Sequence, residues 1–124
     1  GKEYINILKE HKKALKEREQ AEKEQKQLER DQKNLEKEQK KFQKEQKRIA
    51  SAEKKIIKYK DKRQNAMEDL DKMKVKFSKN KSKGKLTPVQ IEKENLKITK
   101  QQLKIKELEE DILDAEKKLN KFRN

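Results

Sequence analysis

The sequence contains no cysteine or tryptophan, one proline and two glycines, and aromatic residues make up only 4% of its 124 positions. Without cysteine, disulfide bridges and thiolate metal sites are excluded. No apolar run approaches the roughly 20 residues that a membrane-spanning helix needs. Hydrophobic residues account for 28% of the chain, against roughly 45–50% in an ordinary globular domain. A conventional packed core is therefore excluded, because too little apolar surface is available to offset the loss of chain entropy.

Charged residues make up half of the chain, and 38 basic residues against 24 acidic ones give a net charge of +14. Only five of the basic residues are arginine. Lysine is a hydrated point charge that attracts an anionic partner without the bidentate recognition typical of arginine. The first residues, GKEYINILKEHKK, lack the apolar segment of a signal peptide. We expect an intracellular, cytoplasmic protein, with peripheral attachment to a membrane as the alternative.

An apolar residue recurs every seven positions through the first half of the chain, as in the seam of a coiled coil. This series comprises Ile7, Ala14, Ala21, Leu28, Leu35, Phe42, Ile49 and Ile56, skips Arg63, and continues at Leu70 and Phe77. It predicts an all-α fold with a first helix of about 75 residues, and we expect two copies to pair along it as an elongated, antiparallel dimer.

The positions beside this series weaken the case for self-pairing. The companion series four residues further on is polar from Arg18 to Lys60. Both outer borders of the seam are acidic, with Glu22, Glu29 and Glu36 on one side and Glu24 and Asp31 on the other. Like charges at such exposed sites repel modestly. A homodimer, a different coiled-coil partner and a solitary helix therefore all stay open for the N-terminal residues.

The periodicity breaks between Ser78 and Lys85, where Gly84 and small polar residues interrupt it. A complete helix start follows. Thr87 is a good N-cap, Pro88 occupies the first helical position and Gln90 completes a capping box. Leu86 and Ile91 occupy the two positions of a hydrophobic staple. The sequence thus predicts a second helix over residues 88–122.

The short connection favours an antiparallel helical hairpin. We expect a highly charged helical arm over residues 1–48 and a hairpin over 49–124, with a lysine-rich turn at 78–87. The second helix is about 35 residues long and has a wide apolar surface. The residues expected to pack the hairpin are Leu70, Phe77, Ile91, Ile98, Ile105, Leu108, Ile112 and Leu119.

Residues that could support catalysis do not converge anywhere in the sequence. The one histidine, His11, lies on the seam beside two lysines. The Asp and Glu carboxylates of the chain lie beside lysines at helix positions that we expect to be exposed. No glycine-rich phosphate loop is present. We expect a non-enzymatic protein without a cofactor, a metal site or a small-molecule substrate.

The most informative charges surround the break between the helices. Seven lysines and no acid occur between residues 72 and 85, at Lys72, Lys74, Lys76, Lys79, Lys81, Lys83 and Lys85. Lys54, Lys55, Lys58, Lys60, Lys62 and Arg63 continue the basic surface down the first helix. Such a cluster attracts an anionic membrane, a nucleic acid or an acidic protein surface. A purely solubilising turn is the alternative. Few arginines and a single nearby aromatic residue, Phe77, argue against specific reading of nucleic acid.

We therefore predict a structural coiled-coil module, a dimerisation or spacer scaffold whose basic hairpin tip docks on an anionic surface. Residues 50–122, with Tyr59–Arg63 leading into the lysine-rich turn, resemble in architecture the BAR superfamily of membrane-curving dimers. BAR domains have three helices and a more apolar dimer core, from which this chain departs. The resemblance implies a membrane-binding and membrane-curving module as one alternative. A binder of acidic cytoskeletal filaments, or a non-specific nucleic-acid binder, is the other.

Overall fold

A computed structural model describes residues 1–123. Within this range the fold is all-α and consists of two helices, α1 (Lys2–Ser82) and α2 (Pro88–Arg123), without strands. The chain divides into two compact units, Gly1–Lys44 and Glu45–Asn124. We call them the N-terminal unit and the hairpin unit. None of the described helices combines the length and apolarity that a membrane span requires.

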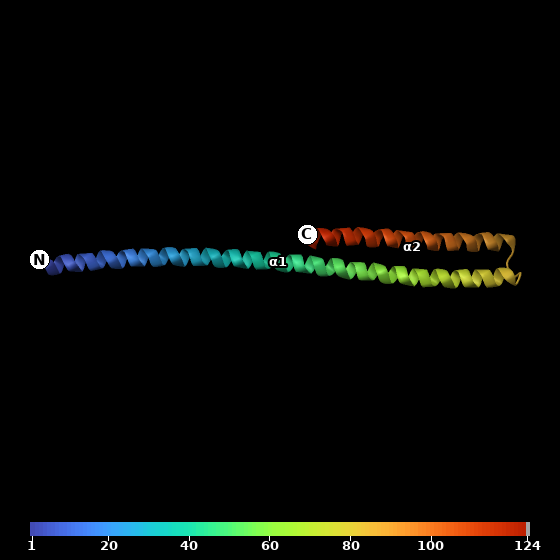
Figure 1. The fold of residues 1–124 in the computed structure, drawn as a ribbon, viewed down its shortest axis with the longest axis horizontal. Coiled ribbons are helices and arrows are strands. Elements are labelled where there is room, and N and C mark those ends of the chain that lie inside the picture. Colours follow the sequence, from blue (N-terminus) through green and yellow to red (C-terminus); the bar gives the residue numbers. More distant parts are fainter. Residues whose placement is uncertain (124) are drawn as a thin grey trace. The chain divides into compact units, whose positions relative to one another are not determined.

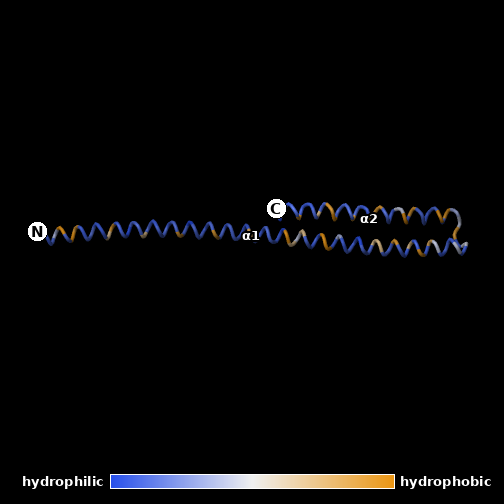
Figure 2. Tube along the Cα trace, in the orientation of Figure 1, coloured by the Kyte–Doolittle hydropathy of each residue, from blue (hydrophilic) through white to orange (hydrophobic). Residues whose placement is uncertain are grey.

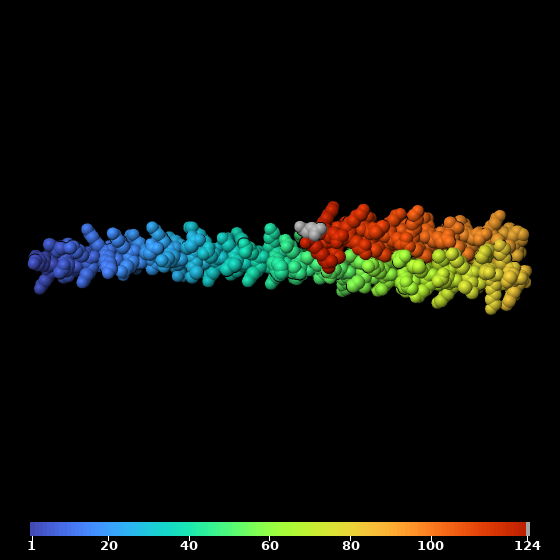
Figure 3. Space-filling model, viewed as in Figure 1, coloured from blue at the N-terminus to red at the C-terminus, as the bar shows by residue number. Residues whose placement is uncertain are grey.

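The hairpin unit contains the second half of α1 and all of α2, which lie side by side in opposite directions (Figure 1). The space-filling view shows them in contact along the hairpin (Figure 3). The predicted antiparallel helical hairpin is therefore confirmed. The structure contains a single chain, so the dimer stays a prediction.

Side chains shielded from solvent follow alternating steps of three and four residues on both helices of the hairpin, which is the spacing of a coiled-coil seam. On α1 they include Ile49, Ala52, Ile56, Tyr59, Arg63, Ala66, Leu70, Met73, Phe77 and Asn80. On α2 they include Ile91, Glu94, Ile98, Gln101, Ile105, Leu108, Ile112, Ala115 and Leu119. The two helices thus bury one stripe each and expose the rest.

The seam on α1 uses a different companion series from the one that we expected. The apolar series is joined by residues three positions further on, such as Ala52, Tyr59 and Ala66. In the series four positions further on, by contrast, Lys60 and Met67 are exposed. The physical reason is that Ala52, Tyr59 and Ala66 are smaller or more apolar than Lys60 and Met67, so they can pack against α2. Arg63, which interrupts the apolar series, stays in the seam by pairing with a carboxylate of α2.

The densest packing lies around Ala66, which is 3% exposed and clusters with Ile105 and Leu108 of α2. Tyr59 and Leu70 pack against this cluster. The amide of Gln101 donates a hydrogen bond to the backbone carbonyl of Ala66, at 2.9 Å from Nε2 to O. The absence of a larger side chain at residue 66 leaves room for this approach. A polar contact inside a coiled-coil seam favours one register over its neighbours.

The N-terminal unit is helical throughout the described residues 2–44, and all of its side chains are exposed. Its trace is mostly hydrophilic, with isolated apolar positions (Figure 2). Ile7, Leu28, Leu35 and Phe42 are 63%, 55%, 58% and 60% exposed. Within this chain, therefore, the apolar series of the N-terminal unit has no packing partner among the described residues.

Candidate anionic-surface docking site

The lysine tip, residues 72–85, comprises the end of α1 and the start of the connection to α2. We expected the turn to begin at Ser78, but α1 continues through Ser78 and ends at Ser82. Serine and asparagine lower helix stability only slightly, whereas glycine readily leaves the helical conformation. The helix accordingly ends just before Gly84, which has a φ of 66°.

The backbone around Gly84 forms a Schellman motif. The amide of Gly84 donates to the carbonyl of Lys81 at 3.1 Å, and the amide of Lys85 donates to the carbonyl of Asn80 at 3.0 Å. These bonds satisfy carbonyl groups that the helix end would otherwise leave without partners. The end of α1 is thus held by backbone hydrogen bonds, and its lysines start from a defined helix terminus.

The start of α2 is fixed in the way that the sequence predicted. The Thr87 amide donates to Gln90 Oε1 at 2.9 Å, and the Gln90 amide donates to Thr87 Oγ1 at 3.2 Å. These reciprocal bonds confirm the capping box. The staple residues Leu86 and Ile91 are both half-buried. Only residues 83–87 separate the two helices.

All seven lysines of the tip are exposed. None of them forms an ion pair with a carboxylate within residues 1–123. Lys79 and Lys81 lie in the last turn of α1, where the negative end of the helix dipole partly offsets their mutual repulsion. The Lys81 ammonium lies 5.7 Å from the centre of the Phe77 ring, so a cation–π contact covers the one aromatic ring of the tip.

The basic residues further down α1 have a different environment. Between Glu107 and Glu116, α2 carries six acidic residues and no basic one. Two ion pairs join the helices in this region, Arg63–Glu109 at 3.1 Å and Lys60–Glu116 at 3.4 Å. Arg123 of α2 also pairs with Glu53 of α1. The acids of α2 thus partly neutralise the basic stretch that we expected to extend the tip. Beside the tip, α2 carries only Glu92 and Glu94, and neither pairs with a tip lysine.

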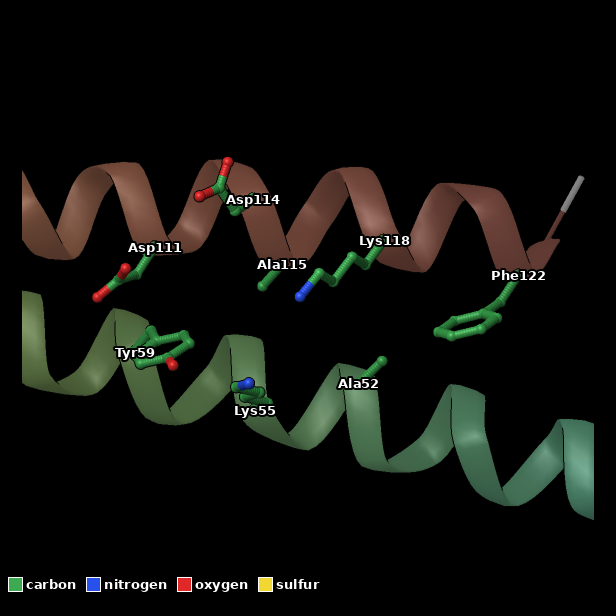
Figure 4. A pocket seen from close by; sticks show the side chains of 8 residues that line it. All are labelled: Ala52, Lys55, Tyr59, Asp111, Asp114, Ala115, Lys118 and Phe122. Carbon is green, nitrogen blue, oxygen red and sulfur yellow. The ribbon is translucent and has the colours of Figure 1, made fainter.

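A shallow gap occurs in the seam near the open end of the hairpin, where Ala52 and Ala115 are too small to fill the space between the helices (Figure 4). Its volume is about 190 Å³. Tyr59 lies at one end of the gap and Phe122 at the other, while Asp114 points away from α1 (Figure 4). Lysines and aspartates both line it, so it has no consistent charge that would select a ligand.

The eight residues assigned to a dimer seam fall into two groups. Ile7, Ala14, Ala21, Leu28, Leu35 and Phe42 are exposed in the N-terminal unit, whereas Ile49 is half-buried and Ile56 buried in the hairpin unit. Within the hairpin, Ile105, Leu108, Ile112 and Leu119 are buried, and Leu70, Phe77, Ile91 and Ile98 are half-buried. Ile49 and Ile56 thus belong to the hairpin seam of one chain.

Sequence reasoning missed Tyr59, Ala66 and Gln101 as hairpin contacts. A signal for the first two was present, because the series containing Ala52, Tyr59, Ala66 and Met73 is more apolar than the series containing Glu53 and Lys60. In the described residues, no group of three or more potential metal ligands is brought together. Comparison with known proteins gives no match to a family model, a curated protein or a solved structure.

Proposed function

We propose that this chain is a non-enzymatic structural coiled-coil module that docks on an anionic surface through the lysine tip. The observation that carries the proposal is the contrast between two basic regions of one hairpin. Acids of α2 pair with Lys60 and Arg63, whereas seven exposed lysines at the tip have no carboxylate partner in the described chain. The attraction that the tip can exert is therefore available for a partner.

An anionic membrane is the surface that the tip fits best. Val75 is 68% exposed and lies between two lysines of the tip. Apolar side chains among lysines suit a lipid interface, where the apolar groups enter the boundary and the lysines meet lipid phosphates. Each lysine near such a surface contributes up to about 1 kcal/mol. The Phe77 ring, covered by Lys81, is poorly placed to stack on a nucleic-acid base.

The remainder of the chain would act as a dimerisation or spacer scaffold. The exposed apolar series of the N-terminal unit supports a coiled-coil contact with a second copy or with a different coiled-coil protein. A BAR-like, membrane-curving module is a variant of the same proposal, since it would use the same tip and a dimer. It differs in one observable, because a curving module deforms vesicles into tubes on binding and a spacer leaves them round.

Co-sedimentation with lipid vesicles tests the docking proposal. The full chain is mixed with vesicles containing phosphatidylserine, or with phosphatidylcholine alone, at about 0.15 M salt. A variant with all seven tip lysines changed to glutamine is run in parallel, and duplex DNA is added as a competitor. We expect binding to the anionic vesicles only, lost in the variant and resistant to DNA.

Each other outcome would replace the proposal with a different one. Loss of vesicle binding on addition of DNA would favour a polyanion binder. Binding to acidic filaments such as microtubules, without binding to vesicles, would favour the cytoskeletal alternative. If the chain binds none of these surfaces, it is a spacer and the lysine tip is only solubilising.

A further inference from the structure

A second apolar stripe follows α2 on the side away from the hairpin seam. Val89, Leu96 and Leu103 recur every seven residues and are 60%, 55% and 55% exposed. Each lies two positions before a seam isoleucine, which places it on the outer face of α2. Single exposed apolar residues are common on protein surfaces. Three at a heptad spacing on one face form a stripe that suits another helix.

Lysines border this outer stripe on one side. Lys93 and Lys100 follow Val89 and Leu96 by four residues, and Lys97 and Lys104 follow Leu96 and Leu103 by one. All four side chains are exposed. Glu107 follows Leu103 by four residues and ends the basic part of this border. The opposite border includes Glu92, Asn95, Thr99, Gln102 and Lys106, that is, one acid, one base and three uncharged residues. A helix that docks here therefore meets an apolar stripe with a mainly basic border.

The apolar series of the N-terminal unit has the opposite charge pattern. An acidic residue follows each of its members by three positions, at Glu10, Glu17, Glu24, Asp31, Glu38 and Glu45. These carboxylates are exposed. Two such series packed against each other bring acid towards acid, since Glu22, Glu29 and Glu36 lie along the other border. The outer stripe of α2 offers lysines in their place.

The two borders of the N-terminal series differ in how many acids they carry, and this difference favours one direction of pairing. On a helix, residues three and four positions after a stripe member lie on opposite sides of that stripe. In a parallel helix pair, opposite borders of the two stripes face each other. In a parallel pair Lys93 and Lys100 face the border that is acidic after every series member, whereas in an antiparallel pair they face the other border, which is acidic only at Glu22, Glu29 and Glu36. The border with more acids therefore favours the parallel arrangement. Because α2 is antiparallel to α1 within the hairpin unit, the N-terminal unit of one copy then runs antiparallel to the hairpin part of α1 in the other copy, and a two-fold dimer forms the contact twice.

We propose that the exposed series of the N-terminal unit docks on the Val89–Leu96–Leu103 stripe of a second copy of this chain. The inference rests on the dimer that is part of the proposed function, and it specifies which surfaces meet. The contact is reciprocal, because each copy supplies one N-terminal unit and one outer stripe. Two observations support this contact: both stripes have a heptad spacing, and the acidic borders of one are complementary to the lysines that border the other.

Mixing two variants of the 124-residue chain tests this arrangement. The stripe variant carries Leu96→Gln and Leu103→Gln, and the arm variant carries Leu28→Gln, Leu35→Gln and Phe42→Gln. Glutamine is a good helix former, and all five replaced side chains are exposed, so both variants keep their helices. Leu113→Gln is the matched control, since Leu113 is 57% exposed on α2 but lies outside the stripe. Equilibrium sedimentation gives the dimer affinity, and native mass spectrometry distinguishes mixed dimers by mass.

We expect the parent and the control to dimerise equally, and each of the other variants alone to dimerise at least about tenfold more weakly. Mixing these two variants restores a heterodimer, because one intact N-terminal unit meets one intact stripe. If the stripe variant dimerises like the parent, the N-terminal units pair with each other and the inference is wrong, while the proposed dimer survives. If the parent is monomeric at tens of micromolar, the dimer itself is wrong and the N-terminal unit awaits a different protein.

Discussion

The hairpin seam predicts that two adjacent residues of α2 differ sharply in their contribution to stability. Ile112 is 8% exposed in the seam, whereas Leu113 is 57% exposed on the outside of the same helix. Truncation to alanine removes three aliphatic carbons from either residue. At about 0.8 kcal/mol for each buried carbon group, full burial would make the loss about 2.4 kcal/mol.

The open geometry of a two-helix seam sets the expected size of each effect. The seam is bordered by solvent and leaves no closed cavity, so Ile112→Ala should cost about 2 kcal/mol, at the low end of buried substitutions. Leu113→Ala removes less than half as much buried apolar surface, and alanine is a better helix former than leucine. We therefore expect Leu113→Ala to reduce stability by about 0.7 kcal/mol. Isoleucine is a poorer helix former than leucine, so Ile112→Ala gains more helix propensity than Leu113→Ala. A larger loss of stability at Ile112 therefore reports its burial.

Hydrogen exchange of the α2 amides measures this difference directly, since it follows opening of the hairpin separately from fraying of the N-terminal unit. The expected losses of amide protection are about 30-fold for Ile112→Ala and about threefold for Leu113→Ala, at 1.4 kcal/mol for each factor of ten. Equal losses for the two variants would refute the seam that the structure shows. They would mean that α2 does not pack on α1 in solution.

Three further predictions concern the turn and the polar contacts of the hairpin. Gly84→Ala should destabilise the hairpin by about 1 kcal/mol, because residue 84 has a positive φ that alanine adopts only with strain. A steric clash does not contribute, since a Cβ at residue 84 would meet no atom within 4 Å. An unchanged midpoint of urea denaturation would contradict this prediction. Thr87→Ala should cost about 1 kcal/mol by removing the acceptor for the Gln90 amide, and its effect should appear as faster exchange in the first turn of α2. Arg63→Gln should cost about 0.5 kcal/mol or less, because its pair with Glu109 is partly exposed, and added salt should erase that difference in melting temperature.

The sequence was sufficient to predict the hairpin where it contained local signals. Gly84, Thr87, Pro88 and Gln90 each have a conformational preference that acts within one turn of chain, and together they locate the end of one helix and the start of the next. The seven-residue repeats of both helices predicted which faces are apolar. Each of these patterns lies within one helix or one turn, so it can be recognised without knowing how the two helices pack.

The features that escaped prediction depend on how two distant segments meet. The hydrogen bond from Gln101 to the carbonyl of Ala66 depends on the stagger of α2 against α1, so neither helix alone predicts it. Likewise, the lysines from Lys54 to Arg63 look like a continuation of the tip until the acids of α2 are placed opposite them. Both errors come from reading one helix without its neighbour.

The central claim is that the lysine tip, and not the net charge of the chain, docks the protein on an anionic surface. Two variants with equal net charge test it most directly. One replaces the seven tip lysines with glutamine, and the other replaces seven lysines of the N-terminal unit, namely Lys9, Lys16, Lys23, Lys26, Lys33, Lys37 and Lys44. Affinity for phosphatidylserine vesicles is measured at about 0.15 M salt.

At up to about 1 kcal/mol for each lysine near the lipid surface, the tip variant should lose at least about a hundredfold in affinity. The variant of the N-terminal unit should lose less than about tenfold, since its lysines act only through the long-range field, which salt screens. Equal losses in the two variants would contradict the account, because the net charge would then explain the binding and the tip would have no special role.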